Sequence, residues 1–537
     1  MQNKTLLLFI GVLIIGAFFR FYLIQEIPPG LYPDEATNGN NAVEALSTGA
    51  FKVFYPENNG REGLFINLQA IAIRALGTEP WVLRLVSAIF GTLTIAGLWL
   101  LARELSLSPL LPFFSSFFLA ASYWHINFSR IGFRAIMVPF FSVFTMYLLL
   151  RALRKGGILE SVGAGILLGL GLNTYIASRF LPFVVAVPRL FFLWVWWKAS
   201  AVASFCAPCL IALFLLGAIV ASLPLGLYFI EHPGDFLGRG GQVSIFAGEN
   251  PVYEFAKSNA LTLQMFFWKG DCNQRHNFNC EPELHWPVAV FFLIGSALAI
   301  RGVVKFLKNR GMPKNDQAAS LMILAWFFFM LFPATLTREG LPHALRSIGL
   351  IPPVFLLAGW GATYLWEKIK SYLDGACEDP QWVERRAQIN RIKKEFAVLM
   401  ALLLIFIGVH AYRAYFVRFA HSIDTQNAFA ADLVQIGRYI NALPRETKKI
   451  VVVDTQDVII RGVPAPAQTP MFISDTFGEE KRAAKNVTYV KSMDEIQLPP
   501  KDKVAVIPIN TNPLKELKKR FPGLRVKLQD GFVSLEN

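Results

Sequence analysis

Apolar runs of about 20 residues, separated by short polar segments, recur along the first 412 residues of the chain. A run of this length and composition predicts a helix that crosses a lipid bilayer. The third run is short, and the seventh is long enough to tilt or to project beyond the bilayer. The pattern predicts eleven membrane-spanning helices, at residues 5–24, 81–102, 109–124, 132–150, 158–177, 180–197, 202–230, 286–300, 318–335, 344–366 and 396–412.

Beyond residue 412 the apolar runs shorten to the length of β-strands. Residues 450–453, 504–509 and 524–528 predict strands, and residues 513–519 predict a helix. The chain therefore divides into a membrane module at residues 1–412 and a small soluble α/β domain at residues 413–537. The predicted fold class is a polytopic α-helical membrane protein with a C-terminal α/β domain.

The polar segment after the first run contains two further helical patterns. Residues 35–48 predict a short helix that ends at Gly49, and residues 62–76 predict an amphipathic helix that ends at Gly77. The second pattern carries Arg74 and is too polar to span a membrane well. We expect it to lie in the membrane interface.

Composition and charge placement support a membrane protein and set its orientation. The 537 residues are 54% hydrophobic and only 17% charged, against about 25% in soluble proteins. The net charge of +14 is concentrated in short loops between apolar runs, which is typical of cytoplasmic loops and argues against nucleic acid as a partner. The N-terminus is therefore predicted to be cytoplasmic. The loops at 25–80 and 231–285 and the C-terminal domain are then extracytoplasmic.

Two adjacent carboxylates, Asp34 and Glu35, follow the first span in the stretch Pro28-Pro29-Gly30-Leu31-Tyr32-Pro33-Asp34-Glu35-Ala36. One interpretation is that Asp34 caps the helix that begins there. The other is a catalytic or ligand-binding role, and the two are compatible. We expect the loops at 25–80 and 231–285 to form an active site around this pair.

Basic side chains converge on the same membrane face. The clusters around 124–134, 173–179 and 337–346 all lie at predicted outer junctions between spans. Each arginine alone is typical of a side chain that reaches from a helix end to the interface. Several guanidinium groups beside one carboxylate pair favour a phosphate-bearing substrate, because arginine binds phosphate through paired hydrogen bonds. The residues expected to bind the phosphate and lipid of such a substrate are Arg61, Arg130, Arg134, Tyr175, Arg179 and Arg346.

The second outer loop carries the stretch from Trp268 to Cys280, which is rich in polar side chains. Cys272 and Cys280 are predicted to form a disulfide, because an outer compartment is often oxidising. A zinc site made from Cys272, His276 and Cys280 is an alternative that lacks an evident fourth ligand. The residues expected to contact substrate are Asp271, Arg275, His276 and Asn277 from this loop, together with His343.

These groups suit sugar transfer from a lipid phosphate. The phosphate leaves as an anion and needs electrostatic stabilisation, whereas the acceptor hydroxyl needs a general base. Asp34 is the predicted base. Glu35 or Glu62 is predicted to orient the acceptor or to raise the basicity of Asp34.

Several motifs resemble the superfamily of protein O-mannosyltransferases and aminoarabinose transferases. They are Arg20 and the stretch Pro28 to Ala36, Gly60-Arg61-Glu62-Gly63-Leu64-Phe65, Trp81 to Ala88, Phe128-Ser129-Arg130, and Leu341-Pro342-His343-Ala344-Leu345-Arg346. The resemblance covers residues 5–360 and implies the GT-C fold, a polyprenyl- or dolichyl-phosphate sugar donor and inverting transfer with Asp34 as base. The chain departs from the aminoarabinose transferases after Glu62, where Gly63-Leu64 replaces their Lys-Pro-Pro. The sugar and the acceptor therefore do not carry over.

Two other function classes remain alternatives. A transporter or flippase for a lipid-linked sugar usually shows internal repeats and broken helices, and no repeat is evident here. A metal-dependent oligosaccharyltransferase of the same fold would use spaced acidic residues to hold a divalent cation, to which Glu62 or Asp271 would contribute. The favoured prediction has no metal or other cofactor. Its partners are the lipid bilayer, a polyprenyl-phosphate sugar and an acceptor that is a protein, a lipid or a glycan.

Overall fold

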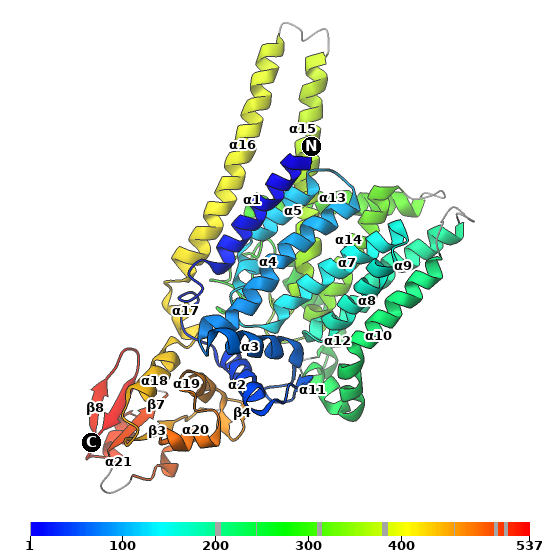
Figure 1. Cartoon of the computed structure of the whole chain (residues 1–537). Helices are drawn as coiled ribbons and strands as arrows, with labels where there is room; N and C mark the ends of the chain where they lie inside the picture. The colour runs from blue at the N-terminus through cyan, green and yellow to red at the C-terminus, as the bar shows by residue number, and fades with distance from the viewer. Residues whose placement is uncertain are drawn as a thin grey trace.

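The computed structural model describes residues 2–198, 206–242, 244–308, 314–378, 385–455, 457–498, 503–509 and 514–537. A helix lies at the position of each of the eleven predicted spans, so the predicted fold class is confirmed (Figure 1). These helices are α1 (Gln2–Phe21), α4 (Pro80–Leu105), α5 (Leu111–Ala120), α7 (Met137–Lys155), α8 (Ile158–Leu172), α9 (Leu181–Lys198), α10 (Ala207–Glu231), α13 (Trp286–Lys308), α14 (Asn315–Thr335), α15 (Ile351–Glu378) and α16 (Arg386–Tyr412).

Two of these helices are shorter than a bilayer requires. Within the described ranges, nine helices are long and apolar enough to cross a membrane, whereas α5 and α8 are not. A span needs about 20 residues at 1.5 Å of rise each. The ten residues of α5 are almost all buried against neighbouring helices, so α5 is packed inside the bundle.

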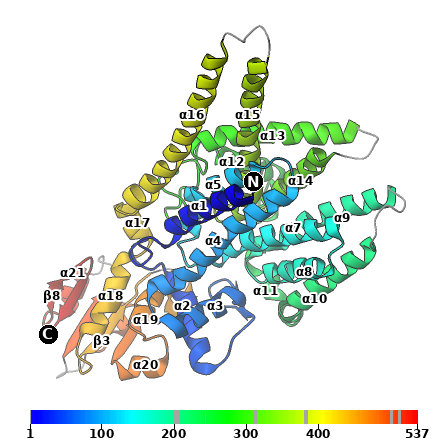
Figure 2. The ribbon, with the colours of Figure 1, turned by 45° about the horizontal axis from the view of Figure 1, so that its top comes forward.

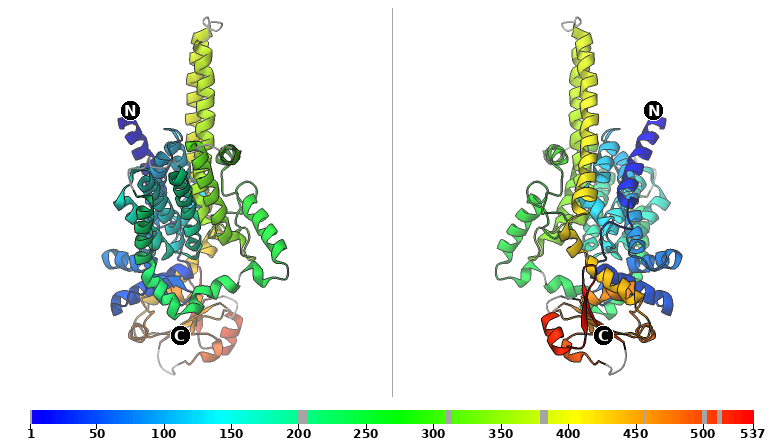
Figure 3. Two further views of the ribbon diagram at one scale, coloured as in Figure 1. Left: turned by 90° about the vertical axis from the view of Figure 1, so that its right-hand side faces the viewer. Right: turned by 90° about the vertical axis from the view of Figure 1, so that its left-hand side faces the viewer.

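The ends of the bundle differ in what they carry. Helices α15 and α16 extend together well past the other helices at one end, which the side views show most clearly (Figure 3). At the opposite end lie α2 (Pro33–Thr48), α3 (Gly63–Leu76), α11 (Pro233–Gln242) and the C-terminal domain (Figures 1 and 2). The two predicted outer loops are therefore gathered at one end, as the charge pattern requires.

The helices predicted in the first outer loop are confirmed. Helix α2 ends at Gly49, whose φ of 71° lies in the left-handed region that glycine adopts without strain. Helix α3 follows a short hairpin in which Phe54–Tyr55 pairs antiparallel with Arg61–Glu62. This hairpin places Arg61 and Glu62 between the two helices and fixes the direction in which their side chains point.

The C-terminal domain is built on one mixed sheet. Its five strands lie in the order β6 (Val487–Val490), β3 (Lys448–Val452), β7 (Val504–Pro508), β9 (Val533–Glu536) and β8 (Arg525–Leu528). The pairs of β3 with β6 and with β7 are parallel, and the other two pairs are antiparallel. The predicted strands at 450–453, 504–509 and 524–528 correspond to β3, β7 and β8, and the predicted helix to α21 (Leu514–Arg520).

The first residues after α16 belong to the membrane module by packing. Tyr415, Phe416 and Phe419 from the π-helical segment Arg413–Phe419, and Phe429 after it, join the apolar core formed by the spanning helices. The separate core of the sheet domain begins with α18 (Ala431–Ala442).

The C-terminal domain docks on the first outer loop through polar contacts. Arg461 donates to Glu44 at 2.6 and 2.7 Å and to Glu57 at 2.6 Å. Thr469 donates to the carbonyl oxygen of Leu31. At Gly30, with a φ of 74°, a Cβ atom would lie 2.4 Å from the carbonyl oxygen of Phe429, so this close approach requires glycine. These contacts hold the domain against the start of α2, where Asp34 lies.

Candidate active site

A cavity of about 560 Å³ opens where the two outer loops meet the segment between α14 and α15. The predicted site residues that line it are Asp34, Arg61, Glu62, Arg134, Tyr175, Arg179, Arg275, His276, His343 and Arg346. They come from positions spread over more than half of the chain. The convergence of arginines and a carboxylate that the topology implied is therefore present in the structure.

Asp34 occupies the first turn of α2 and faces the cavity. Tyr32 is the N-cap residue of this helix and makes no side-chain cap, so the interpretation of Asp34 as the cap is wrong. Asn58 donates to Asp34 Oδ1 at 2.7 Å and fixes the carboxylate. Asn58, Asn59 and Gly60 all have positive φ, which turns the loop back toward α2.

Glu62 and Arg134 form an ion pair on the cavity wall. The distance between Arg134 Nε and Glu62 Oε2 is 2.8 Å, and both side chains are largely buried. The guanidinium group also lies over the ring of Tyr175, 5.4 Å from its centroid. The ion pair orients the Arg134 side chain. The other arginines of the cavity form hydrogen bonds to uncharged groups.

Four cavity arginines donate to neutral oxygens, and one of them, Arg346, donates to the Thr337 hydroxyl and to the carbonyl oxygen of Glu339. Arg61 donates to the amide oxygens of Asn38 and Asn41, both at 2.6 Å. Arg179 donates to the carbonyl oxygen of Phe236, and Arg275 donates to the Asn273 side chain. These bonds orient the guanidinium groups without neutralising them, so the wall is suited to an anion.

Burial, with a smaller effect from the nearby Arg134, lowers the pKa of Arg61 to about 10. This value is still far above neutral pH, so the guanidinium group stays charged. It contributes positive charge to the cavity although its side chain is only 3% exposed.

Glu35 and Arg130 were predicted site residues that the structure turns away from the cavity. Glu35 is fully buried, pairs with Arg84 at 3.1 Å and accepts from the backbone nitrogen of Gly132 at 2.6 Å. Arg130 donates to the carbonyl oxygens of Phe19 and Ile27. Both side chains tie the outer loop to the helices, and neither reaches the space where substrate would lie.

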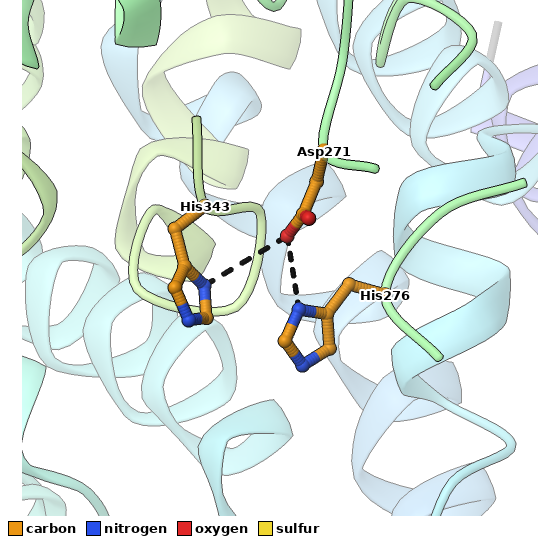
Figure 4. Close-up of side chains that lie close together, drawn as sticks. All are labelled: Asp271, His276 and His343. Atoms are coloured by element: carbon orange, nitrogen blue, oxygen red, sulfur yellow. Dashed lines mark hydrogen bonds and ion pairs between the residues drawn. The ribbon is translucent and has the colours of Figure 1, made fainter. Parts of the chain in front are cut away.

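Asp271 and Asn277 stand behind the cavity wall. Asn277 is buried and donates to the carbonyl oxygen of Glu281, within its own loop. Asp271 Oδ2 lies 2.9 Å from Nδ1 of His276 and 3.8 Å from Nδ1 of His343 (Figure 4). Asp271 therefore lies next to the two cavity imidazoles and does not itself line the cavity.

A disulfide closes this loop. Cys272 and Cys280 are joined, with their Cα atoms 4.3 Å apart. Both thiols are consumed by the bond, so the alternative zinc site of Cys272, His276 and Cys280 is wrong. The cross-link constrains the segment that carries Arg275 and His276 and that begins directly after Asp271.

Glu283 is a buried carboxyl group next to Asp271. Its Oε1 accepts from the backbone nitrogen of Asp271 at 3.4 Å. Burial and the charge of Asp271 raise the pKa of Glu283 well above its ordinary value of 4.5. The folded protein therefore binds a proton here that the unfolded chain releases, and stability falls as the pH rises from 4.5 through the raised pKa.

The variant Glu283→Gln should remove the loss of stability that accompanies ionisation of Glu283 at high pH. We expect its melting temperature to exceed that of the wild type by at least about 2 °C at pH 8, and the two to differ less at pH 5. Thermal unfolding of the detergent-purified proteins at both pH values measures this. Equal melting temperatures at pH 8 would show that Glu283 is ionised without cost.

Some residues of the site were not predicted, because their signal in the sequence is weak or absent. Asn58 carries a weak one, since Asn-Asn-Gly favours a left-handed turn. Asp457 lines the cavity from the C-terminal domain, through a contact between segments more than 400 residues apart.

A second, open groove of about 530 Å³ runs between the start of α2 and this domain, and its lining residues include Asp34, Asp432, Thr455 and Asp457. Asp34 thus borders both spaces.

Comparison with known proteins agrees with this architecture. Residues 64–223 match the family model described as dolichyl-phosphate-mannose-protein mannosyltransferase. Two solved structures of ArnT from Cupriavidus metallidurans, one in the apo state and one bound to undecaprenyl phosphate, are similar over 100% of this chain and 98% of theirs. Their TM-scores are 0.61 and 0.57, each at 14% sequence identity. No curated protein matched the sequence.

The class of protein follows from these findings. The fold is that of ArnT along the whole chain, and the mannosyltransferase family model covers the part from α3 into α10. The resemblance expected from the sequence is confirmed in the fold and in the matched family segment, and the chain is a multi-pass membrane protein with the fold of ArnT.

Proposed function

We propose that this protein transfers a sugar from a polyprenyl-phosphate donor to an acceptor hydroxyl, with inversion at the anomeric carbon and with Asp34 as the general base. The observation that carries the proposal is the position of Asp34. Its carboxylate lies where the arginine-lined cavity and the groove beside the C-terminal domain adjoin. A base between a donor space and an acceptor space is what direct transfer requires.

The donor side of the proposal rests on the walls of the cavity. The charged lining residues include Arg61, Arg134, Arg179, Arg275 and Arg346. The apolar lining residues include Phe180, Phe236, Phe246, Phe332, Pro333 and Leu336. Guanidinium groups and aromatic rings in one cavity suit a phosphate that is attached to an isoprenoid chain. The ArnT relative with bound undecaprenyl phosphate has the same fold.

The reaction needs one bond to form and one to break. The acceptor oxygen attacks the anomeric carbon from the face opposite the phosphate, and its proton passes to the Asp34 carboxylate. The bond between the anomeric carbon and the phosphate oxygen breaks, and its electron pair stays on the phosphate. The cavity arginines stabilise this developing charge, so the leaving group needs no proton.

The acceptor side is the groove between α2 and the C-terminal domain. Its ionisable lining residues in the described chain, Asp34, Asp432 and Asp457, are all acidic. An acidic groove favours a neutral hydroxyl-bearing acceptor over an anionic one. With the N-terminus in the cytoplasm, the groove and the cavity open on the extracytoplasmic side of the membrane.

The test uses purified protein and a radiolabelled polyprenyl-phosphate sugar with a pool of candidate acceptors. Wild-type protein should transfer the label. The variant Arg275→Gln should raise KM for the donor about 10- to 100-fold, because it removes a charged hydrogen-bond donor from the cavity. The matched control is Arg74→Gln, since Arg74 is exposed on α3 and lies outside the cavity. Donor binding without turnover under any condition would favour the flippase alternative.

A further inference from the structure

We propose that Arg461, in the C-terminal domain, is a positioning residue for the proposed base, Asp34. Arg461 donates to both carboxylate oxygens of Glu44, at 2.6 and 2.7 Å, and to the Glu57 carboxylate at 2.6 Å. Glu44 lies on α2, the helix that carries Asp34. Glu57 comes directly before Asn58, which donates to Asp34 Oδ1 at 2.7 Å. One guanidinium group thus binds both segments that set the position of Asp34, a role that rests on the proposed function.

The arginine holds two carboxylates together that would otherwise repel. Hydrogen bonds from Arg461 lower the pKa of Glu44 below its ordinary value of 4.5, so this group is ionised at neutral pH. Glu44 and Glu57 are both partly buried. Without the guanidinium group, two negative charges share one space that is poorly screened by water, and repulsion moves the loop away from α2. Asn58 then moves with the loop, away from Asp34.

The backbone at Arg461 indicates a role beyond the turn itself. Arg461 and Gly462 join β4 (Ile459–Ile460) to its antiparallel partner β5 (Val463–Pro464) in a two-residue hairpin turn. Their φ angles are 48° and 83°, and a turn with both of these angles positive favours Asn-Gly. Arginine adopts the left-handed conformation only at an energetic cost, and such outliers cluster at functional sites. The side chain at this unfavourable position is the one that reaches the two carboxylates.

The C-terminal domain has other contacts that dock it on α2. Asn40 donates to the backbone and side-chain oxygens of Gln468, both at 3.0 Å, and each of these two residues is only 1% exposed. Phe472 of the domain packs in one apolar cluster with Leu31 and other residues of the outer loop. These buried contacts remain when Arg461 is replaced. We therefore expect such a replacement to change the local geometry around Asp34 and not the position of the domain.

The test uses variants that keep the backbone conformation. Arg461→Asn removes the ion pairs, and asparagine suits the left-handed turn. Asn58→Gly keeps the positive φ at position 58 and removes the hydrogen bond to Asp34. The matched control is Arg520→Asn, because Arg520 also pairs with a carboxylate of the C-terminal domain but lies outside the cavity lining. Thermal unfolding of the full-length proteins shows that each variant is folded.

Steady-state transfer of a radiolabelled sugar from its polyprenyl phosphate measures the effect on activity. Arg461→Asn should lower kcat about 10-fold, because a displaced Asn58 no longer orients the base. KM for the donor should stay within about threefold, since Arg61 keeps its bond to Asn38. In the Asn58→Gly background, Arg461→Asn should change kcat less than about twofold, because both substitutions remove the same contact. The control should also change kcat less than about twofold.

Hydrogen exchange of the loop amides gives a readout that needs no activity. The backbone nitrogen of Gly60 donates to the carbonyl oxygen of Glu57, and Arg461→Asn should speed its exchange at least about fivefold. Unchanged exchange, an unchanged kcat, or the same loss of kcat with and without Asn58→Gly would overturn the positioning role. Faster exchange in the variant, together with no sugar transfer by the wild type, would refute the proposed function and support the hold of Arg461 on the loop.

Discussion

Replacing Asp34 with Asn should lower kcat for sugar transfer by a factor of about 10²–10⁴, the usual contribution of a general base. The amide has nearly the shape of the carboxylate, but it cannot accept the acceptor's proton. The substitution leaves every cavity arginine in place, so KM for the donor should stay within about threefold of the wild-type value. The measurement is steady-state transfer of a radiolabelled sugar over a range of donor concentrations that reaches saturation.

The matched control is Asp235→Asn. Asp235 lines the same cavity and accepts a hydrogen bond from the Tyr228 hydroxyl at 2.7 Å, which an amide oxygen can also accept. This variant removes one negative charge from the cavity without touching the proposed base, and its kcat should change less than about threefold. Full activity in Asp34→Asn would refute the assignment and direct attention to Glu62, the other predicted carboxylate on the wall.

The architecture was readable from the sequence because membrane spans have a strong and local pattern. Each apolar run became a helix, and the strands of the C-terminal domain appeared where the runs shortened. The strands β6 and β9 were not predicted. Their residues are short mixed runs, and they become strands by pairing with β3 and β7. The sequence shows periodicity, but the partner of a strand is a property of the whole fold.

The sequence predicted on which membrane face the site lies, but it did not predict which side chains point into the cavity. Topology brings every outer arginine to one end, which made the convergence of Arg134, Arg179 and Arg346 predictable. Asp34 and Glu35 were both predicted to lie in the site, Asp34 as the base and Glu35 as a supporting group, because the sequence does not show which way each of two neighbouring side chains points. On a helix, adjacent residues point about 100° apart, so only one of them faces the cavity.

The same limit explains Arg130 and Asp271. Arg130 follows the short helix α6 (Tyr123–Phe128), and its side chain turns inward to two backbone carbonyl groups. Asp271 was grouped with His276 as a substrate contact because both are polar residues of one loop. The structure gives them different positions, one behind the wall and one on it. A polar residue in an outer loop can be identified from the sequence as a candidate site residue. The direction in which its side chain points depends on tertiary contacts.

Replacing Glu35 with Gln should destabilise the protein strongly, by about 3–5 kcal/mol, because it breaks a buried ion pair and leaves one charge uncompensated. Glu35 binds Arg84 through two bonds, at 3.1 and 3.2 Å, and both side chains are at most 1% exposed. Arg84 also donates to the carbonyl oxygens of Pro28 and Gly30. The pair therefore fixes the turn that leads into α2, and its loss should loosen the segment that presents Asp34.

Thermal unfolding in detergent measures this effect, with Glu26→Gln as the control, because Glu26 is an exposed carboxylate of the same segment. The control should unfold at the wild-type temperature. The double variant Glu35→Gln/Arg84→Met should recover part of the loss, since no buried charge then remains unpaired. The folded fraction of Glu35→Gln should retain a kcat far above that of Asp34→Asn. A kcat as low as that of Asp34→Asn at an unchanged melting temperature would instead make Glu35 a participant in the chemistry.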